Sequence, residues 1–430
     1  MRTKIRVKRH HFWTFEPLET RQVLSTLFVS PTGSDSGTGT AAAPYKTLQK
    51  AANVAVAGDI VDVASGKYAG FVMGWDTPKS GLPGKPITFI GEPGAIINTK
   101  NPKTRDGIDI EGGSWITIQG FTVTGMGRAG IRSTGGDHVV IQNNIADGNS
   151  RWGIFTSFDT NVLIQNNVAS HSTKEHGIYV SNSAVNPTVA NNVVFGNRGC
   201  GIHMNGDASQ GGTEIITGAS ITGNVVFDNG VHGGSAINLD GVQNSVISNN
   251  LLYNNHHSGI SLFQEDSSGP STNDTVTNNT VIMAANSKWG SALNLQNGSI
   301  NTNVSNNILV NTNPRWLVSL QASADSLPGL VSDNNALMAM ESADGGNSMI
   351  SLAKWRGLAG NDIHSVPTTT ATIGFTDVSN DNYQLTANSP AAGLGASVSL
   401  AKDPSGALSV RITMNSSLSR ERATSSPAAR

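Results

Sequence analysis

The stretch that decides the fold is EHGIYVSNSAVNPTVANNVVFGNRGCGIHMNGD, which runs from Glu175 to Asp207. It holds two runs of one pattern, GIYV from Gly177 and GIHM from Gly201, which begin 24 residues apart. Within each run apolar side chains alternate with others, as in a strand that buries one face. Because the run recurs at this spacing, we expect successive strands to stack in a repetitive fold.

The same run recurs over most of the chain, with starts at Gly107, Gly130, Gly153, Gly177, Gly201, Ala236, Gly259, Ala292 and Leu317. The second positions hold Ile108, Ile131, Ile154, Ile178, Ile202, Ile237, Ile260, Leu293 and Val318. The fourth positions hold Ile110, Ser133, Thr156, Val180, Met204, Leu239, Leu262, Leu295 and Leu320. Alternation predicts that these two sets point into the interior of the fold.

Paired asparagines, or an equivalent pair, form a second ladder in phase with the first. Their second members are Asn144, Asn167, Asn192, Asn224, Asn250, Asn279 and Asn307. Asparagine tolerates the backbone angles of a tight bend, and its amide can bond to the coils on either side. We therefore predict an all-β protein, a single-stranded right-handed parallel β-helix with three strands per coil. A leucine-rich horseshoe and a β-propeller would need repeats that this chain lacks.

The segments outside the ladder predict the ends of the domain. A helix is expected from Tyr45 to Ala55, with an apolar face that would cover the exposed end of the β-helix. We divide the chain into a basic leader (1–27), the β-helix with its N-terminal cap (28–340), a C-terminal cap region with a short helix (341–409) and a disordered tail (410–430).

Composition excludes several classes of partner. A formal net charge of −2 gives no general attraction to nucleic acid, and no apolar run approaches the length of a membrane span. The single cysteine, Cys200, excludes an internal disulfide framework. The segment FEPLETRQVLS resembles a leader of exported bacterial proteins, so we expect a secreted or cell-surface monomer. A disordered basic tail is the alternative for this segment.

Together the ladders, the opening VSPTGSDSGTGTAAAPYKTLQKAANVAVAGDIVDVASGKY and the stretch quoted first resemble the pectate-lyase-like right-handed β-helix superfamily, over residues 28–395. The quoted stretch is similar to the lyase and alginate-epimerase branch. The resemblance implies an extracellular protein with a polysaccharide ligand. The Asp-Pro-His motif of the alginate epimerases and a compact aspartate cluster of calcium-dependent pectate lyases are missing, so catalytic residues are assigned by role.

If the second and fourth positions point inward, the third and fifth positions form an outward strip. The third positions hold Asp109, Arg132, Phe155, Tyr179, His203, Asn238, Ser261 and Asn294, and the fifth include Asn205, Asp240 and Phe263. The spacing of the runs widens after Gly201 and after Gly259, where NGDASQGGTEIITGA and QEDSSGPSTND are inserted. Both insertions should rise beside one groove, and long loops on a regular scaffold often carry function.

Removing the C5 proton of a uronate requires a cation that neutralises the neighbouring carboxylate, a base that takes the proton and an acid. Arg198 suits the neutraliser, His203 or Lys174 the base and Tyr179 the acid, with His176 nearby. We expect Asn205, Asn238, Ser261 and Phe263 to contact substrate. Asp207, Asp240 and Asp266 are the candidate ligands for a calcium ion.

Other interpretations remain open for these residues. His203 can be an outward polar residue without a chemical duty, Tyr179 a platform for a sugar ring, and Arg198 the partner of a neighbouring aspartate. Asp207 can be a turn residue, and His176 an inward structural group. The sequence therefore favours a polysaccharide lyase or C5-epimerase. Non-catalytic carbohydrate binding, or a glycoside hydrolase using Asp207 and Asp240, is the alternative.

Overall fold

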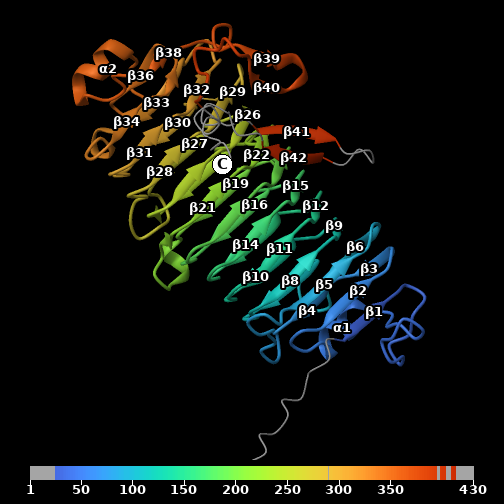
Figure 1. Cartoon of the computed structure of the whole chain (residues 1–430). Helices are drawn as coiled ribbons and strands as arrows, with labels where there is room; N and C mark the ends of the chain where they lie inside the picture. Colours follow the sequence, from blue (N-terminus) through green and yellow to red (C-terminus); the bar gives the residue numbers. More distant parts are fainter. Residues whose placement is uncertain (1–24, 289, 395–397, 403–407, 413–430) are drawn as a thin grey trace, which may run out of the picture.

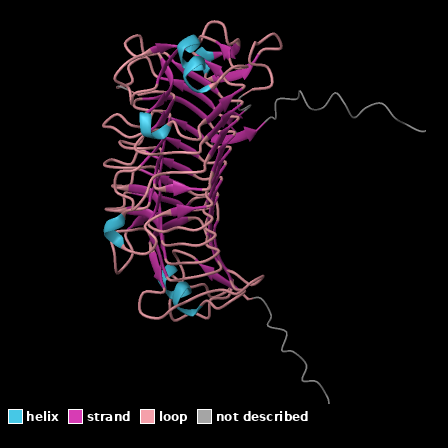
Figure 2. Ribbon diagram, turned by 90° about the vertical axis from the view of Figure 1, so that its left-hand side faces the viewer, coloured by secondary structure: helices cyan, strands magenta, loops and turns pink. Residues whose placement is uncertain are grey.

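The computed structural model describes residues 25–288, 290–394, 398–402 and 408–412. The chain forms an elongated solenoid with one twelve-stranded sheet on each of three sides (Figure 1). Each coil supplies one strand to each sheet in turn, and side by side the strands of successive coils run parallel (Figure 2). The predicted right-handed parallel β-helix is confirmed.

The three sheets are named by the order in which a coil enters them. Sheet 1 holds β1 (Thr26–Val29), β2 (Ile60–Val63), β5 (Ile87–Gly91), β8 (Ile116–Gln119), β11 (Val140–Gln142), β14 (Leu163–Gln165), β17 (Thr188–Ala190), β21 (Ser220–Thr222), β25 (Val246–Ser248), β28 (Thr275–Thr277), β31 (Asn303–Ser305) and β34 (Val331–Asp333). Sheet 2 holds β3 (Gly66–Ala69), β6 (Ala95–Thr99), β9 (Thr122–Thr124), β12 (Ile145–Asp147), β15 (Val168–Ser170), β18 (Val193–Phe195), β22 (Val225–Phe227), β26 (Leu251–Asn255), β29 (Thr280–Met283), β32 (Ile308–Asn311), β35 (Ala336–Leu337) and β38 (Val366–Pro367).

Sheet 3 carries the repeated four-residue runs. It holds β4 (Phe71–Met73), β7 (Ile108–Glu111), β10 (Ala129–Thr134), β13 (Trp152–Ser157), β16 (Ile178–Ser181), β19 (Ile202–Asn205), β23 (Ile237–Asp240), β27 (Ile260–Phe263), β30 (Leu293–Leu295), β33 (Val318–Ala322), β36 (Met340–Ser342) and β37 (Ile350–Ser351). Three small pairs complete the strands: β20 (Ile216–Thr217) with β24 (Val242–Gln243), β39 (Phe375–Asp377) with β40 (Asn382–Leu385), and β41 (Val398–Lys402) with β42 (Leu408–Ile412).

The register of sheet 3 confirms the predicted ladder except at one coil. Ile178 pairs with Ile202 and Ile202 with Ile237, and all three side chains are buried in the core. The assignment at β33 was wrong, because Leu293 pairs with Leu320 and not with Val318. A strand has a period of two, so a shift of two residues leaves the same face buried and the pattern cannot reveal it.

The asparagine ladder holds the coils together in the way the pairs predicted. Asn191, the first member of one pair, has a φ of 56°, and the second member, Asn192, is fully buried. The backbone N–H and the Nδ2 of Asn192 both donate to Oδ1 of Asn224, at 2.9 and 3.0 Å. This arrangement satisfies the polar groups of a buried bend by linking them to the next coil.

Both ends of the apolar core are covered by helices. The N-terminal helix α1 (Leu48–Val54) is shorter than predicted, and Oγ1 of Thr47 caps it by accepting from the Lys50 N–H. At the other end α2 (Leu352–Ala359) buries Trp355, whose Nε1 donates to Asp362 at 2.8 Å. Three short 3₁₀ segments, η1 (Ala208–Gln210), η2 (Ala324–Ser326) and η3 (Val378–Asn380), lie in loops. Helices α1 and α2 therefore close a core that stacked strands alone would leave open.

The predicted leader (1–27) and the predicted tail (410–430) lie mostly outside the residues that the structure describes. Residues 1–24 of the leader and 413–430 of the tail lie outside the described residues. Strand β1 begins at Thr26, and β42 extends to Ile412, beyond the predicted start of the tail. Among the described helices, none has the length and apolar character needed to cross a membrane.

Candidate functional site

The outer face of sheet 3 carries one continuous column of side chains, which we call the strip. Its members are in register from β7 to β33 and are Asp109, Arg132, Phe155, Tyr179, His203, Asn238, Ser261, Asn294 and Gln321. The strip has a charged end, an aromatic centre and an amide-rich end. Each part offers a ligand different chemistry.

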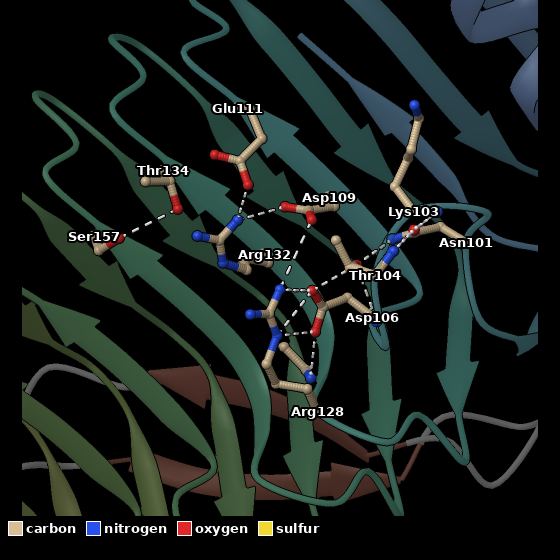
Figure 3. A network of polar contacts seen from close by, with 11 residues as sticks. Asn101, Lys103, Thr104, Asp106, Asp109, Glu111, Arg128, Arg132, Thr134 and Ser157 are labelled. Atoms are coloured by element: carbon tan, nitrogen blue, oxygen red, sulfur yellow. Dashed lines mark hydrogen bonds and ion pairs between the residues drawn. The ribbon is translucent and has the colours of Figure 1, made fainter. Parts of the chain in front are cut away.

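The charged end is an interlocked ion-pair cluster (Figure 3). Arg132 lies between Asp109, at 2.8 Å from Nη1 to Oδ1, and Glu111, to which the same nitrogen donates. Arg128 holds the fully buried Asp106, with 2.8 Å between Nε and Oδ1. Both guanidinium groups are therefore occupied by carboxylates of the neighbouring coil and are not free to bind an acidic ligand.

Burial dominates the protonation of one member of this cluster. Asp109 is fully buried, and desolvation raises its pKa to about 6 despite the attraction of Arg132. No residue in the described part of the chain makes a hydrogen bond to its Oδ2, and Nη2 of Arg128 lies 3.9 Å away. The cluster joins neighbouring coils, and nothing in its geometry singles it out for chemistry.

An aromatic stack forms the centre of the strip. The rings of Trp152 and Phe155 stack at 4.3 Å between centroids, and Phe155 meets Tyr179 edge-on at 5.3 Å. Tyr179 in turn lies nearly parallel to His203, at 4.8 Å and 23°. The stack therefore brings a phenol and an imidazole into direct contact, as the outward third positions predicted.

His203 is a neutral imidazole at ordinary pH. Only 9% of the residue is exposed, and desolvation lowers its pKa to about 4. Its Nδ1 lies 3.2 Å from the carbonyl oxygen of Asn238, to which it donates when protonated. Its Nε2 then keeps a lone pair, and no described residue makes a hydrogen bond to it. At neutral pH His203 is thus unprotonated, the form that a general base requires.

His176 has a structural role beside Tyr179 and His203. Its ring lies 4.6 Å from that of His203, and its Nδ1 accepts the backbone N–H of Cys200 at 3.0 Å. Burial, followed by the nearness of His203, lowers the pKa of His176 well below its ordinary value. Its lone pair is already used, so it suits the alternative of a satisfied structural group.

Tyr179 is held protonated, and an amide donor lies beside it and another beside His203. Burial raises the pKa of its hydroxyl, and Nδ2 of Asn205 approaches that hydroxyl at 3.4 Å. Nδ2 of Asn238 lies 3.1 Å from Nδ1 of His203. A phenol that can donate a proton, an imidazole that can accept one and two neutral amides therefore meet on adjacent coils.

Burial of His203 makes stability sensitive to acid. In the unfolded chain His203 binds a proton near pH 6.5, whereas in the folded chain it does so only near pH 4. Between these values the unfolded state binds more protons, so stability falls as pH falls. We expect the difference in unfolding free energy between the wild type and His203→Asn to change by about 3 kcal/mol between pH 7 and pH 4. Urea unfolding of both proteins at the two pH values measures this, and a constant difference would contradict it.

The amide-rich end opens into a cavity of about 370 Å³, which we call the amide pocket. It is lined by Gly234, Ser235, Asn238, His257, Ser258, Ser261, Phe263, Glu265, Asn294, Gln296 and Asn297. Three predicted substrate contacts, Asn238, Ser261 and Phe263, therefore share one cavity. A larger cavity of about 470 Å³ lies beside α1, at the end of the solenoid.

Two predicted cations lie apart from the Tyr179–His203 pair. Arg198 is exposed, and its Nη2 lies 3.4 Å from Nδ1 of His232 on the following coil. Lys174 is also exposed, and no hydrogen bond or ion pair joins its ammonium group to another described residue. Within the described residues, neither cation makes a hydrogen bond to Tyr179 or His203.

The three predicted calcium ligands have other partners. Both oxygens of buried Asp240 accept from the turn at 265–267, including the N–H of Asp266 at 2.7 Å and Oγ of Ser267 at 2.6 Å. Asp207 caps η1 by accepting from the Ser209 N–H. Exposed Asp266 has Oδ2 at 3.4 Å from Nδ2 of Asn205. Across the described chain, no group of three His, Cys, Asp or Glu residues could hold a metal ion.

The two inserted loops do pack together beside the strip. The N–H of Ala208 donates to the carbonyl of Asp266 at 2.7 Å, and Ser268 donates to Glu214 at 3.4 Å. Asp240 explains this contact, because its carboxylate accepts hydrogen bonds from residues 265–267 and so fixes the conformation of the second loop. Asp240 therefore shapes the border of the site, which leaves little support for a hydrolase that uses it with Asp207.

The sequence pattern did not identify Gln321 as a member of the strip. Gln321 pairs with Asn294, and its Nε2 donates to Oδ1 of that residue at 3.0 Å. The shifted register at β33 hid it, and testing a second register would have found it. Missed as well were Lys288, Arg315 and Trp316, which lie in turns and follow no periodic pattern.

Comparisons with known proteins support the β-helix superfamily. Residues 27–179 match the family described as Pel9A-like, right handed beta helix region. The solved structure of pectate lyase Pel9A is 18% identical, with a TM-score of 0.55 over 86% of this chain and 91% of that chain. An alginate lyase from Paenibacillus sp. str. FPU-7 is also 18% identical, with a TM-score of 0.47 over 66% of this chain and 94% of that one.

A curated relative matches a short segment. It is the uncharacterized protein YwoF of Bacillus subtilis (strain 168), 44% identical over 63 residues, or 15% of this chain. The match spans 13% of the length of that relative. At these identities the comparisons establish a fold shared with pectate lyase Pel9A.

Proposed function

We propose that this protein binds an acidic polysaccharide along the strip and removes the C5 proton of a uronate at Tyr179 and His203. The observation that carries the proposal is the contact between a protonated phenol and a neutral imidazole, 4.8 Å between ring centroids. The likeness of the fold to pectate lyase Pel9A supports it. A secreted or cell-surface location fits such a substrate.

The chain's own groups can serve each step. Nε2 of His203 takes the C5 proton, and the electron pair of that bond forms the C4–C5 double bond as the C4–O bond breaks. The hydroxyl of Tyr179 gives its proton to the leaving oxygen. In an epimerase, the phenol instead returns a proton to the opposite face of C5. Amide donors of Asn205 and Asn238 would stabilise the charge on the carboxylate.

The low pKa of His203 is compatible with this role once substrate is bound. A carboxylate close to an imidazole stabilises its charged form and raises its pKa toward neutrality. In the free protein the same low pKa keeps the ring unprotonated. The bound uronate would thus supply the charge that makes the base stronger.

Non-catalytic binding is the second candidate, and one observation favours it. Arg132, the cation on the strip itself, is paired with Asp109 and Glu111, and Arg198 lies beside His232. The amide pocket offers neutral donors and acceptors, which suit recognition of sugar hydroxyl groups. Such a surface can bind a polysaccharide without acting on it.

The test is incubation of the full chain with pectate, alginate and glycosaminoglycans, with and without calcium. Elimination produces an unsaturated uronate that absorbs ultraviolet light, and proton NMR reports inversion at C5. A signal on any uronate polymer is the expected result, and Lys354→Ala, an exposed change on α2, should retain it. A flat trace and unchanged C5 configuration, together with measurable binding, would instead establish the second candidate.

A further inference from the structure

A third cavity, here called the cationic pocket, lies between the turns at 285–288 and 313–316. It has a volume of about 430 Å³ and is walled by Lys288, Arg315 and Trp316. These turns follow β29 and β32, so the pocket lies on neighbouring coils at the approach to sheet 3. Its size lies within the range of small-ligand sites.

Hydrogen bonds of buried asparagines join the walls of this pocket. Nδ2 of Asn313 donates to the carbonyl of Ser287 at 2.8 Å, which ties one turn to the other. Nδ2 of Asn311 donates to the carbonyls of Gly290 and Val318 at 2.8 and 3.1 Å. Buried amides therefore hold both turns before any ligand arrives, which lowers the cost of binding.

The pocket carries positive charge without compensation. No ion pair within the described part of the chain includes Lys288 or Arg315, and both are exposed. Nearby, burial followed by the charge of Lys288 lowers the pKa of His257, which lines the amide pocket. The backbone N–H of Lys288 also donates to the carbonyl of His256 at 2.8 Å, so Lys288 lies next to a wall of the amide pocket.

A chain of hydrogen bonds connects the two pockets. Nε1 of Trp316 donates to Oγ of Ser291 at 3.2 Å, and Ser291 donates to Oε1 of Gln321 at 3.0 Å. Gln321 then reaches Asn294 of the amide pocket at 3.0 Å. Ser291 and Gln321 are buried, so this chain runs beneath the surface and ties the walls of the two pockets to each other.

We infer that the cationic pocket binds an anionic group of a sugar, a carboxylate or a sulfate ester, next to the neutral amide pocket. Lys288 and Arg315 meet the charge, and the indole of Trp316 provides an apolar face for the ring. The polymer thus presents a charged sugar at one pocket and hydroxyl groups at the other. The inference rests on the proposed function for its class of ligand, an acidic polysaccharide, and needs no catalysis.

Isothermal titration of full-length His203→Asn protein, which is expected to turn over little substrate, tests the inference. The probes are a galacturonate oligosaccharide, a sulfated galactan oligosaccharide and the same galactan without sulfate. Adding Lys288→Ala and Arg315→Ala should weaken binding of the anionic probe about tenfold or more and leave the uncharged probe unchanged. The probe that responds identifies the group as carboxylate or sulfate.

Two controls keep the test decisive. Lys288→Arg with Arg315→Lys retains both charges and should retain most of the affinity, whereas Lys67→Ala with Lys354→Ala removes two exposed cations elsewhere and should change little. Equal affinity after the double alanine change, or equal loss for the uncharged probe, would overturn the inference. Failure of the elimination assay alone leaves this result standing, because titration measures binding.

Discussion

Asn224→Ala is expected to lower the free energy of unfolding by about 4 kcal/mol, because it strands several buried polar groups at once. Oδ1 of Asn224 accepts from the backbone N–H and the side chain of Asn192. Its Nδ2 donates to the carbonyl of Val189 and to Oδ1 of Asn250, at 2.9 and 3.0 Å. Alanine replaces none of these bonds, and water cannot enter a site that is fully buried.

Chemical denaturation of the wild type and this variant measures the loss. The matched control is Asn53→Ala, an exposed position in α1 whose Oδ1 accepts from Gln49, and it should change stability by no more than about 0.5 kcal/mol. A loss below about 1 kcal/mol for Asn224→Ala would mean that neighbouring coils repair the ladder, and that its stabilising role is small.

His203→Asn is expected to reduce kcat/KM on the active uronate polymer by about a hundredfold to ten-thousandfold. Asparagine keeps a polar side chain beside Asn238 but cannot take the C5 proton. Tyr179→Phe should cause a loss of the same order, because it keeps the aromatic ring and removes the hydroxyl. The phenylalanine variant thus separates a proton donor from a platform for the sugar ring.

Initial rates from ultraviolet absorbance, with binding measured separately, check this prediction. His171→Asn is the matched control, because His171 is exposed beyond β15 of sheet 2 and pairs with Asp147 away from the strip. Its activity should stay near that of the wild type. If both His203→Asn and Tyr179→Phe retain full activity, the pair is not the reacting centre.

Much of the fold could be predicted because it follows from short-range patterns. Alternation within GIYV and GIHM selects strands, and the asparagine pairs mark the bends between them. The same alternation predicted which side chains face outward, so the contact of Tyr179 with His203 followed from register alone. The pattern failed at β33, where a period of two cannot distinguish Leu320 from Val318.

The sequence by itself determined the β-helix, its asparagine ladder and the strip on sheet 3, because each depends on a local repeat that sets backbone geometry coil by coil. Only the tertiary structure decided which charges are free. It paired Arg132 with Asp109, used Asp240 to hold a loop, and placed Lys288 beside Arg315 without an ion pair among the described residues. The physical reason is that pairing and desolvation depend on contacts between residues of different coils, and no repeat within the chain records those distances.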